Sequence, residues 1–115
     1  MTPHGETGLD RLFHALADTS RRGMIDRLSR GPASVSELAQ PLRMALPSVV
    51  KHLAVLQAGG VVTSEKAGRV RTYRLAPAAL DQVEAWAAAR KAGYEAQFDR
   101  LEAYLLAQTD EGDAP

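Results

Sequence analysis

Residues 34–60 read SVSELAQPLRMALPSVVKHLAVLQAGG, and this stretch decides the fold of the 115-residue chain. Ser34 and Glu37 form an S-x-x-E capping box, which predicts a short helix over 34–42. A second helix is predicted from about Pro47 to the glycine pair that closes the stretch, because proline suits a first helical turn and glycine suits a helix end. The sequence therefore predicts two short helices joined by a tight turn.

The second of these helices has one apolar face and one face of small or polar residues. At about 100° per residue, the apolar face holds Leu46, Val49, Leu53 and Leu56, and the outward face holds Pro47, Ser48, Lys51, Ala54 and Val55. Small outward residues let a helix approach a DNA major groove closely, so Ser48 and Lys51 are candidate contacts to base edges or phosphates. His52 lies at the border of the faces, either as a DNA contact or as a structural histidine that touches the neighbouring hairpin.

Two helices are predicted before this pair. The first shows apolar residues at spacings of three and four, at Leu9, Leu12, Phe13, Leu16 and Ala17. Asp18 then predicts the N-cap of a helix over 19–29. We expect this helix to bury Met24, Ile25 and Leu28 and to turn Arg21, Arg22 and Arg27 outward.

A hairpin is predicted after the helix pair, with strands over 61–66 and 69–75 around an Ala67-Gly68 turn. It carries Lys66, Arg69 and Arg71. The two arginines are two residues apart on the second strand, so we expect them on one face, where they would straddle a phosphate backbone or enter a minor groove. The alternative is a charged edge strand that prevents aggregation.

One long helix is predicted over 77–107, longer than a compact monomer of this size needs. Its apolar stripe, Leu80, Val83, Ala87, Tyr94, Phe98, Leu101 and Leu105, with Trp86 and Tyr104 beside it, predicts contact with a second subunit. The alternative is packing against the first helix of the same chain. Residues 1–8 and the acidic residues 108–115 are expected to be disordered tails around a single domain over 9–107.

The charge distribution is polarised although the net charge is zero. Residues 19–74 carry ten Lys and Arg against three acids, a net +7, and the flanks carry −7. A basic middle segment is typical of phosphate contact, although a solvated surface gives the same count. The chain has no cysteine, no long apolar run and no signal-peptide pattern, so we expect a cytoplasmic protein that uses no thiol chemistry.

Over about residues 9–106 the chain resembles the ArsR-type winged helix-turn-helix repressors. The resemblance rests on LADTSRRGMIDRLSRGPASVSELAQPLRMALPSVVKHLAVLQAGGVV followed by SEKAGRVRTYRL. It is most similar to the branch with LPSV-type recognition helices, whose genes often accompany a lipid-binding or polyketide-cyclase-like protein. The implied fold is mainly α with a small β-hairpin, in the order α-α-α-α-β-β-α, and the implied protein is a homodimeric repressor of its own or a neighbouring operon.

The resemblance also implies the roles of particular residues. DNA contacts fall on Ser34, Ser36, Pro47, Ser48, Lys51, His52, Lys66, Arg69 and Arg71. The dimer interface falls on Leu9, Leu12, Phe13, Trp86, Tyr94, Phe98, Leu101 and Leu105. A two-fold protein implies a near-palindromic operator. Ala45 and Val50 replace serines that are common in relatives, so base preference is expected to differ.

Metal sensing is not expected, because the chain lacks cysteine and the long helix lacks histidine. No cofactor is expected, and no motif for an enzyme is present. The aromatic residues of the long helix leave open a small-molecule inducer between subunits, although dimer core is the simpler interpretation. The alternative function is a dimeric interaction protein whose helix-turn-helix no longer binds DNA.

Overall fold

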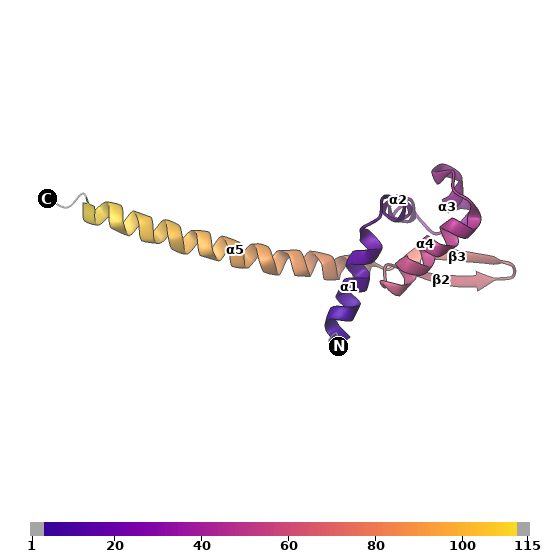
Figure 1. Ribbon diagram of the computed structural model, residues 1–115, viewed down its shortest axis with the longest axis horizontal. Helices are drawn as coiled ribbons and strands as arrows, with labels where there is room; N and C mark the ends of the chain where they lie inside the picture. The colour runs from indigo at the N-terminus through magenta and orange to yellow at the C-terminus, as the bar shows by residue number, and fades with distance from the viewer. Residues whose placement is uncertain (1–3, 113–115) are drawn as a thin grey trace. The chain divides into compact units, whose positions relative to one another are not determined.

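The computed structural model describes the backbone of residues 4–112 and the side chains of residues 8–109. The chain divides into two compact units, Met1–Leu80 and Asp81–Pro115. The elements in chain order are α1 (His4–Leu16), α2 (Thr19–Leu28), β1 (Ala33–Ser34), α3 (Val35–Leu42), α4 (Leu46–Ala58), β2 (Val62–Ala67), β3 (Val70–Leu75) and α5 (Pro77–Gly112) (Figure 1). The predicted order of helices and hairpin strands is confirmed, and β1 is an addition.

Both ends of the described chain are more helical than predicted. The predicted disorder of 4–8 and 108–112 is corrected to helix, because a nucleated helix gains one hydrogen bond per added residue. Residues 1–3 and 113–115 of these predicted tails lie outside the described residues. The predicted single domain over 9–107 also differs from the observed division at Leu80, since almost every described side chain beyond that point is exposed.

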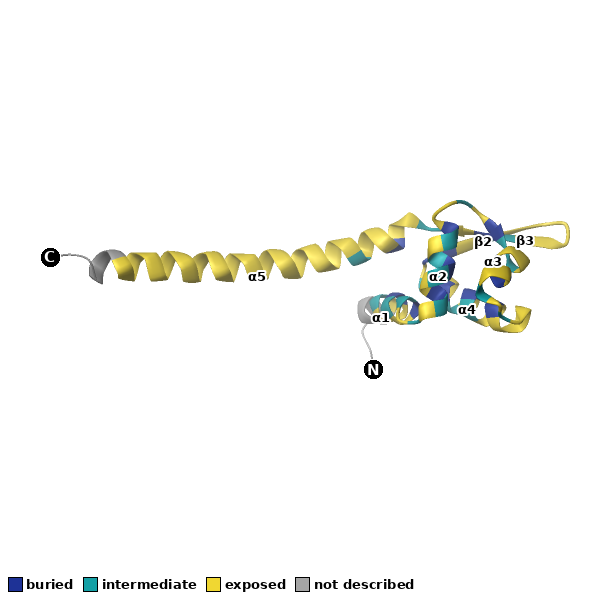
Figure 2. Cartoon of the chain, turned by 90° about the horizontal axis from the view of Figure 1, so that it is seen from above, coloured by how far each residue is buried: buried dark blue, intermediate teal, exposed yellow. Residues whose placement is uncertain are grey.

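The core of the first unit gathers one apolar face from each helix (Figure 2). Its largest fully buried side chains are Leu12, Met24, Leu38, Leu53, Leu56, Val49, Val61 and Val62. Leu12 is 0% exposed, so its assignment to a dimer interface is wrong: the side chain already fills the interior of its own chain. Leu46, which the sequence placed on the apolar face of its helix, is half exposed because it is the first residue of α4.

The three strands form one antiparallel sheet in the order β1-β3-β2. β1 was missed because two residues are too few for alternation to appear, yet Ala33 pairs with Tyr73 and ties the start of α3 to the hairpin. The turn of the hairpin is Gly68-Arg69, one residue later than predicted. Gly68 has a φ of 65°, in the left-handed region that favours glycine.

Gly59 brings α4 close to α1. A Cβ at this position would lie 2.8 Å from the carbonyl oxygen of Arg11 and 2.9 Å from Cβ of Ala15, both on α1. Such distances are shorter than van der Waals contact, so only glycine permits this approach. Gly60, with a φ of 76°, is the residue that turns the chain after the helix.

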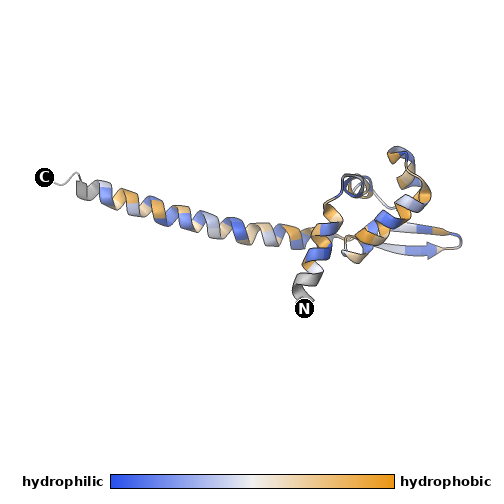
Figure 3. Cartoon of the chain, in the orientation of Figure 1, coloured by the Kyte–Doolittle hydropathy of each residue, from blue (hydrophilic) through white to orange (hydrophobic). Residues whose placement is uncertain are grey.

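The second unit contains the remainder of α5, and its described apolar side chains are exposed apart from the half-buried Val83 (Figure 2). Tyr94, Phe98, Leu101 and Leu105 follow one another at helical spacing, with the rings of Tyr94 and Phe98 edge to face at 4.7 Å. Figure 3 shows apolar and polar residues interleaved along the helix. None of the helices in the described chain has the length and apolar character needed to cross a membrane.

Candidate nucleic-acid interface

Helix α4 presents the outward face that the sequence predicted. Val49, Leu53 and Leu56 are buried and fix the rotation of the helix about its axis. Ser48 and Lys51 are consequently exposed, as is Pro47 in the first turn. Ala45 occupies the N-cap without a side-chain hydrogen bond, so the backbone N–H groups of the first turn have no capping side chain.

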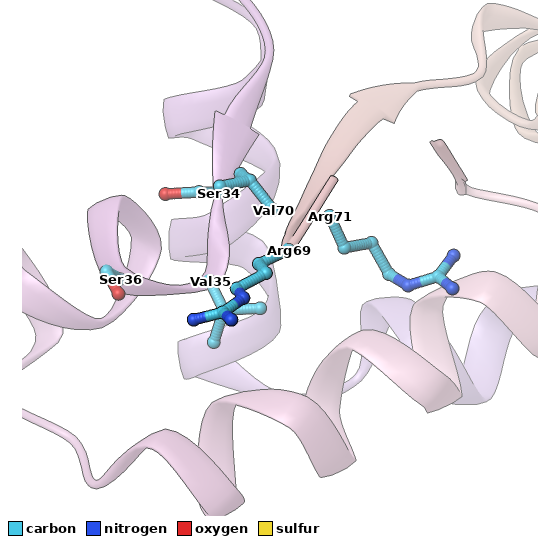
Figure 4. A pocket seen from close by; sticks show the side chains of 6 residues that line it. All are labelled: Ser34, Val35, Ser36, Arg69, Val70 and Arg71. Atoms are coloured by element: carbon cyan, nitrogen blue, oxygen red, sulfur yellow. The ribbon is translucent and has the colours of Figure 1, made fainter. Parts of the chain in front are cut away.

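A hollow of about 260 Å³ lies between the start of α3 and the hairpin, which forms the wing (Figure 4). Its lining is Ser34, Val35, Ser36, Arg69, Val70 and Arg71. Four residues predicted to contact DNA from two distant parts of the sequence therefore lie together. The sequence did not indicate Val70, which is exposed beside the two arginines.

Arg69 and Arg71 occupy different backbone environments, so their predicted placement on one strand face is wrong. Arg69 lies in the turn because the turn begins at Gly68, and in Figure 4 its side chain points toward the start of α3. Arg71 lies on β3 and donates from Nη1 to Ser64 Oγ at 2.9 Å. The two guanidinium groups point in different directions, which spreads the positive charge of the wing.

Lys66 is directly opposite Arg71 in the register of β2 and β3. Like charges at facing positions of an antiparallel pair destabilise the sheet. Both side chains are exposed, and a bound polyanion would turn this repulsion into attraction.

Glu37 is the acidic residue nearest in sequence to the hollow, and its charge is already engaged. Its Oε1 accepts from the backbone N–H of Ser34 at 3.0 Å, and Ser34 Oγ accepts from the N–H of Glu37 at 3.3 Å, so the predicted capping box is confirmed. The hydrogen bond from the Ser34 backbone holds the pKa of Glu37 below its ordinary value. Arg27 Nη2 lies 3.8 Å from the other carboxylate oxygen and offsets its charge.

His52 lies against residues at the start of α2, and not against the hairpin that the structural interpretation gave as its neighbour. Its Nδ1 lies 3.2 Å from Arg21 Nη1 and 3.9 Å from Asp18 Oδ1, and its side chain is only 21% exposed. Because a guanidinium only donates, the contact with Arg21 requires Nδ1 to be the accepting nitrogen. The geometry favours a structural role for His52, which joins α4 to α2.

Arg21 was predicted to point outward but is 8% exposed. It donates from Nε to the Ala15 carbonyl and from Nη2 to the His14 carbonyl, both at 2.9 Å. These are terminal carbonyls of α1, which have no partner within that helix. Burial of Arg21 is favourable because its guanidinium donates to both of these carbonyls. The sequence gave no sign of this contact, since it showed only an arginine three residues after an N-cap.

Among the described residues, no three His, Asp or Glu side chains gather in a group that could hold a metal ion. The acidic side chains of α5 that the structure describes, Asp81, Glu84, Glu95, Asp99 and Glu102, are exposed along one helix. The candidate DNA-binding surfaces of the first unit are the outward face of α4 and the basic wing. Together they define a winged helix-turn-helix protein.

Comparison with known proteins identifies the family within this class. A family model described as "Helix-turn-helix domain" matches residues 16–65. The solved ArsR family transcriptional regulator RHA00566 is 46% identical, with a TM-score of 0.75 over 83% of this chain and 97% of that one. The homodimeric winged helix-turn-helix DNA-binding domain Mb0332 from Mycobacterium bovis is 27% identical, with a TM-score of 0.61 over 73% of this chain and 80% of that one.

Among curated relatives, the arsenical resistance operon repressor of Escherichia coli is 37% identical over 68% of this chain and 64% of its own length. The chain spans between 48% and 66% of the length of the first curated relatives that it matches. The similarity in sequence and the similarity in fold indicate the same family. The chain belongs to the ArsR family of winged helix-turn-helix transcriptional regulators.

Proposed function

We propose that the protein is a homodimeric, sequence-specific DNA-binding repressor of its own or a neighbouring operon. The observation that carries this proposal is the exposure of Ser48 and Lys51 on α4 in the same unit as a basic wing. In this proposal α4 enters a major groove, and the wing contacts the backbone beside it. The arsenical resistance operon repressor among the relatives supports repression rather than activation.

The proposed residue roles follow from exposure and charge. Lys51 and Ser48 reach base edges, Pro47 lets the start of α4 approach the groove, and Lys66, Arg69 and Arg71 bind phosphates. Ser36 and the N-terminus of α3 face the hollow that Arg69 lines, which suits a phosphate oxygen. Ser34 already accepts a hydrogen bond as the N-cap, and His52 positions α4 through Arg21 rather than contacting DNA.

The proposed dimer is supported by the homodimeric neighbour and by the apolar stripe of α5. Its expected contacts are Leu9, Phe13, Trp86, Tyr94, Phe98, Leu101 and Leu105. A two-fold dimer requires a near-palindromic operator with half-site centres about 34–36 Å apart, or one helical turn.

A footprint of the purified protein over the DNA upstream of its gene tests the proposal directly. We expect a protected near-palindrome with affinity that falls steeply as salt rises. Lys51→Ala should weaken binding and change base preference. Arg69→Ala should weaken binding on all sequences. It should also reduce the salt slope, which is the slope of log affinity against log salt concentration, by about one for each phosphate that is no longer neutralised. Weak binding that is indifferent to sequence would refute the proposal.

The alternative is a dimeric interaction protein whose helix-turn-helix no longer reads DNA. It is motivated by the uncapped Ala45 and by Val50, an apolar side chain 47% exposed on α4. A Lys51→Ala, Arg71→Ala double variant separates the two functions. Under the alternative its activity in cells remains intact, and under the repressor proposal it is lost. Both functions place the protein in the cytoplasm, and neither involves catalysis.

A further inference from the structure

The turn between α3 and α4 contains an arginine in an unfavourable backbone conformation. Arg43 has a φ of 53° and a ψ of 39°, in the left-handed region. Its N–H donates to the Gln40 carbonyl at 3.3 Å, and the N–H of Met44 donates to the Ala39 carbonyl at 3.4 Å. This pair of hydrogen bonds is the Schellman motif, whose left-handed position glycine usually occupies because a Cβ crowds the carbonyl there.

Arg43 is the exception among the residues with positive φ in the described chain. Within residues 4–112, the others are Gly31, Gly60 and Gly68, and no other residue with a side chain adopts this conformation. The fold therefore uses glycine elsewhere for left-handed backbone. At Arg43 the sequence retains a long cationic side chain where glycine would relieve strain.

The guanidinium of Arg43 does not compensate for this strain through contacts in the chain. The side chain is exposed, and among residues 8–109 it has no hydrogen-bond or ion-pair partner. One opposing effect remains, because a cation near the C-terminus of α3 interacts favourably with the helix dipole. The experiment below separates this effect from a role in binding.

Arg43 lies close in sequence to the residues of α4 that are proposed to contact DNA. It lies in the turn after α3, three residues before the start of α4, the helix that carries Ser48. No acidic residue lies between Glu37 and Glu65, and Arg43 and Lys51 are the two permanent charges in that span. Both stand on the helix-turn-helix, on either side of the first turn of α4.

We propose that Arg43 is a further DNA-binding residue, which contacts a backbone phosphate at the edge of the groove that α4 enters. The inference rests on the proposed function and adds a residue that neither the pattern of the helices nor the wing indicated. Retaining arginine at a glycine position exchanges stability of the fold for affinity toward a polyanion.

Arg43→Gly tests the proposal because its two expected effects have opposite signs. The variant should raise Tm by about 4 °C or more, since strain is relieved in a small domain. It should lower the affinity of the dimer for its upstream DNA fragment by about tenfold, and reduce the salt slope by about 0.9 for each arginine removed. Thermal unfolding and gel-shift titrations at several salt concentrations measure both effects.

Two variants act as controls. Arg43→Lys retains both strain and charge, so its Tm should stay near wild type and its affinity should fall by no more than about threefold. Arg30→Gly removes an equal charge from the turn after α2, where φ is not positive, and should not raise Tm.

An Arg43→Gly protein that binds with wild-type affinity and salt slope would overturn the phosphate contact. A variant with lower Tm and lower affinity together would also overturn it, and would assign Arg43 to the helix dipole. Failure of the wild-type protein to bind its upstream fragment would instead refute the proposed function, and this contact with it.

Discussion

The two units of the chain treat apolar side chains in opposite ways. In Met1–Leu80, residues such as Leu12, Met24 and Leu53 are 0% exposed, and each helix buries one face. In Asp81–Pro115, Tyr94 and Phe98 are 62% and 53% exposed. Apolar surface left in water forgoes about 25 cal/mol for each Å² that burial would remove. The first unit therefore holds a buried core, whereas the second displays an exposed apolar surface, which supports the proposed dimer.

The largest expected effect comes from charging the surface of the second unit. A Phe98→Asp, Leu101→Asp double variant should convert the proposed dimer into a monomer, because two carboxylates would be buried without partners at the interface. A monomer contacts only one half-site of the operator, so operator affinity should fall by about a hundredfold or more. Sedimentation velocity measures the dissociation and gel-shift titration measures the affinity, and a double variant that stays dimeric would exclude this face.

Ala96→Asp is the matched control for that variant. It places one carboxylate, half the charge that the double variant adds, on α5 about 200° around the helix axis from residue 98. We expect it to leave the dimer intact. If Ala96→Asp dissociates the dimer instead, the interface lies on the side of α5 that carries Ala96, with Ala85, Ala89 and Ala92 at helical spacing.

A smaller effect is expected from breaking the close packing of the first unit. Gly59→Ala should lower the free energy of unfolding by about 1–3 kcal/mol, because the new Cβ would collide with the backbone of α1 at Arg11. Gly23→Ala is the matched control, since its Cβ would meet only Leu42 Cδ2 at 3.4 Å. That variant should raise stability by about 0.5–1 kcal/mol, as alanine favours a helix interior. Urea denaturation measures both, and equal effects would contradict the assigned contact.

The smallest effect concerns acid. The hydrogen bond from the backbone N–H of Arg21 lowers the pKa of Asp18 from its ordinary 3.8, and the bond from Ser34 lowers the pKa of Glu37 from 4.5. A lowered folded-state pKa contributes stability that is full above the ordinary value and is lost as pH falls through the folded value. Unfolding free energy should therefore decline below about pH 4.5, the ordinary value of Glu37.

Asp18→Asn keeps an N-cap that does not titrate, and Glu37→Gln removes the second group. Each variant should flatten the decline in denaturation curves recorded between about pH 6 and pH 3. An unchanged slope in both would assign the acid sensitivity to other carboxylates.

The sequence predicted local structure well where a side chain bonds its own helix end. The Ser34–Glu37 capping box and the Asp18 N-cap are both present, since these hydrogen bonds join residues three apart. Ala45, which stands where serine is common in relatives, occupies the N-cap of α4 and makes no side-chain hydrogen bond. The candidate site was predicted as residue types on two separate segments, but their meeting in one hollow depends on β1, a strand too short to show a pattern.

The sequence by itself determined the order of the elements, the outward face of α4 and the basic character of the middle segment. Periodicity and capping are properties of neighbouring residues, so no long-range contact is needed to recognise them. Only the tertiary structure decided that Arg21 and His52 face each other, that Gly59 must have no side chain and that Leu12 belongs to the core. Each depends on a residue from a distant segment, whose approach is fixed by packing and leaves no trace in local spacing.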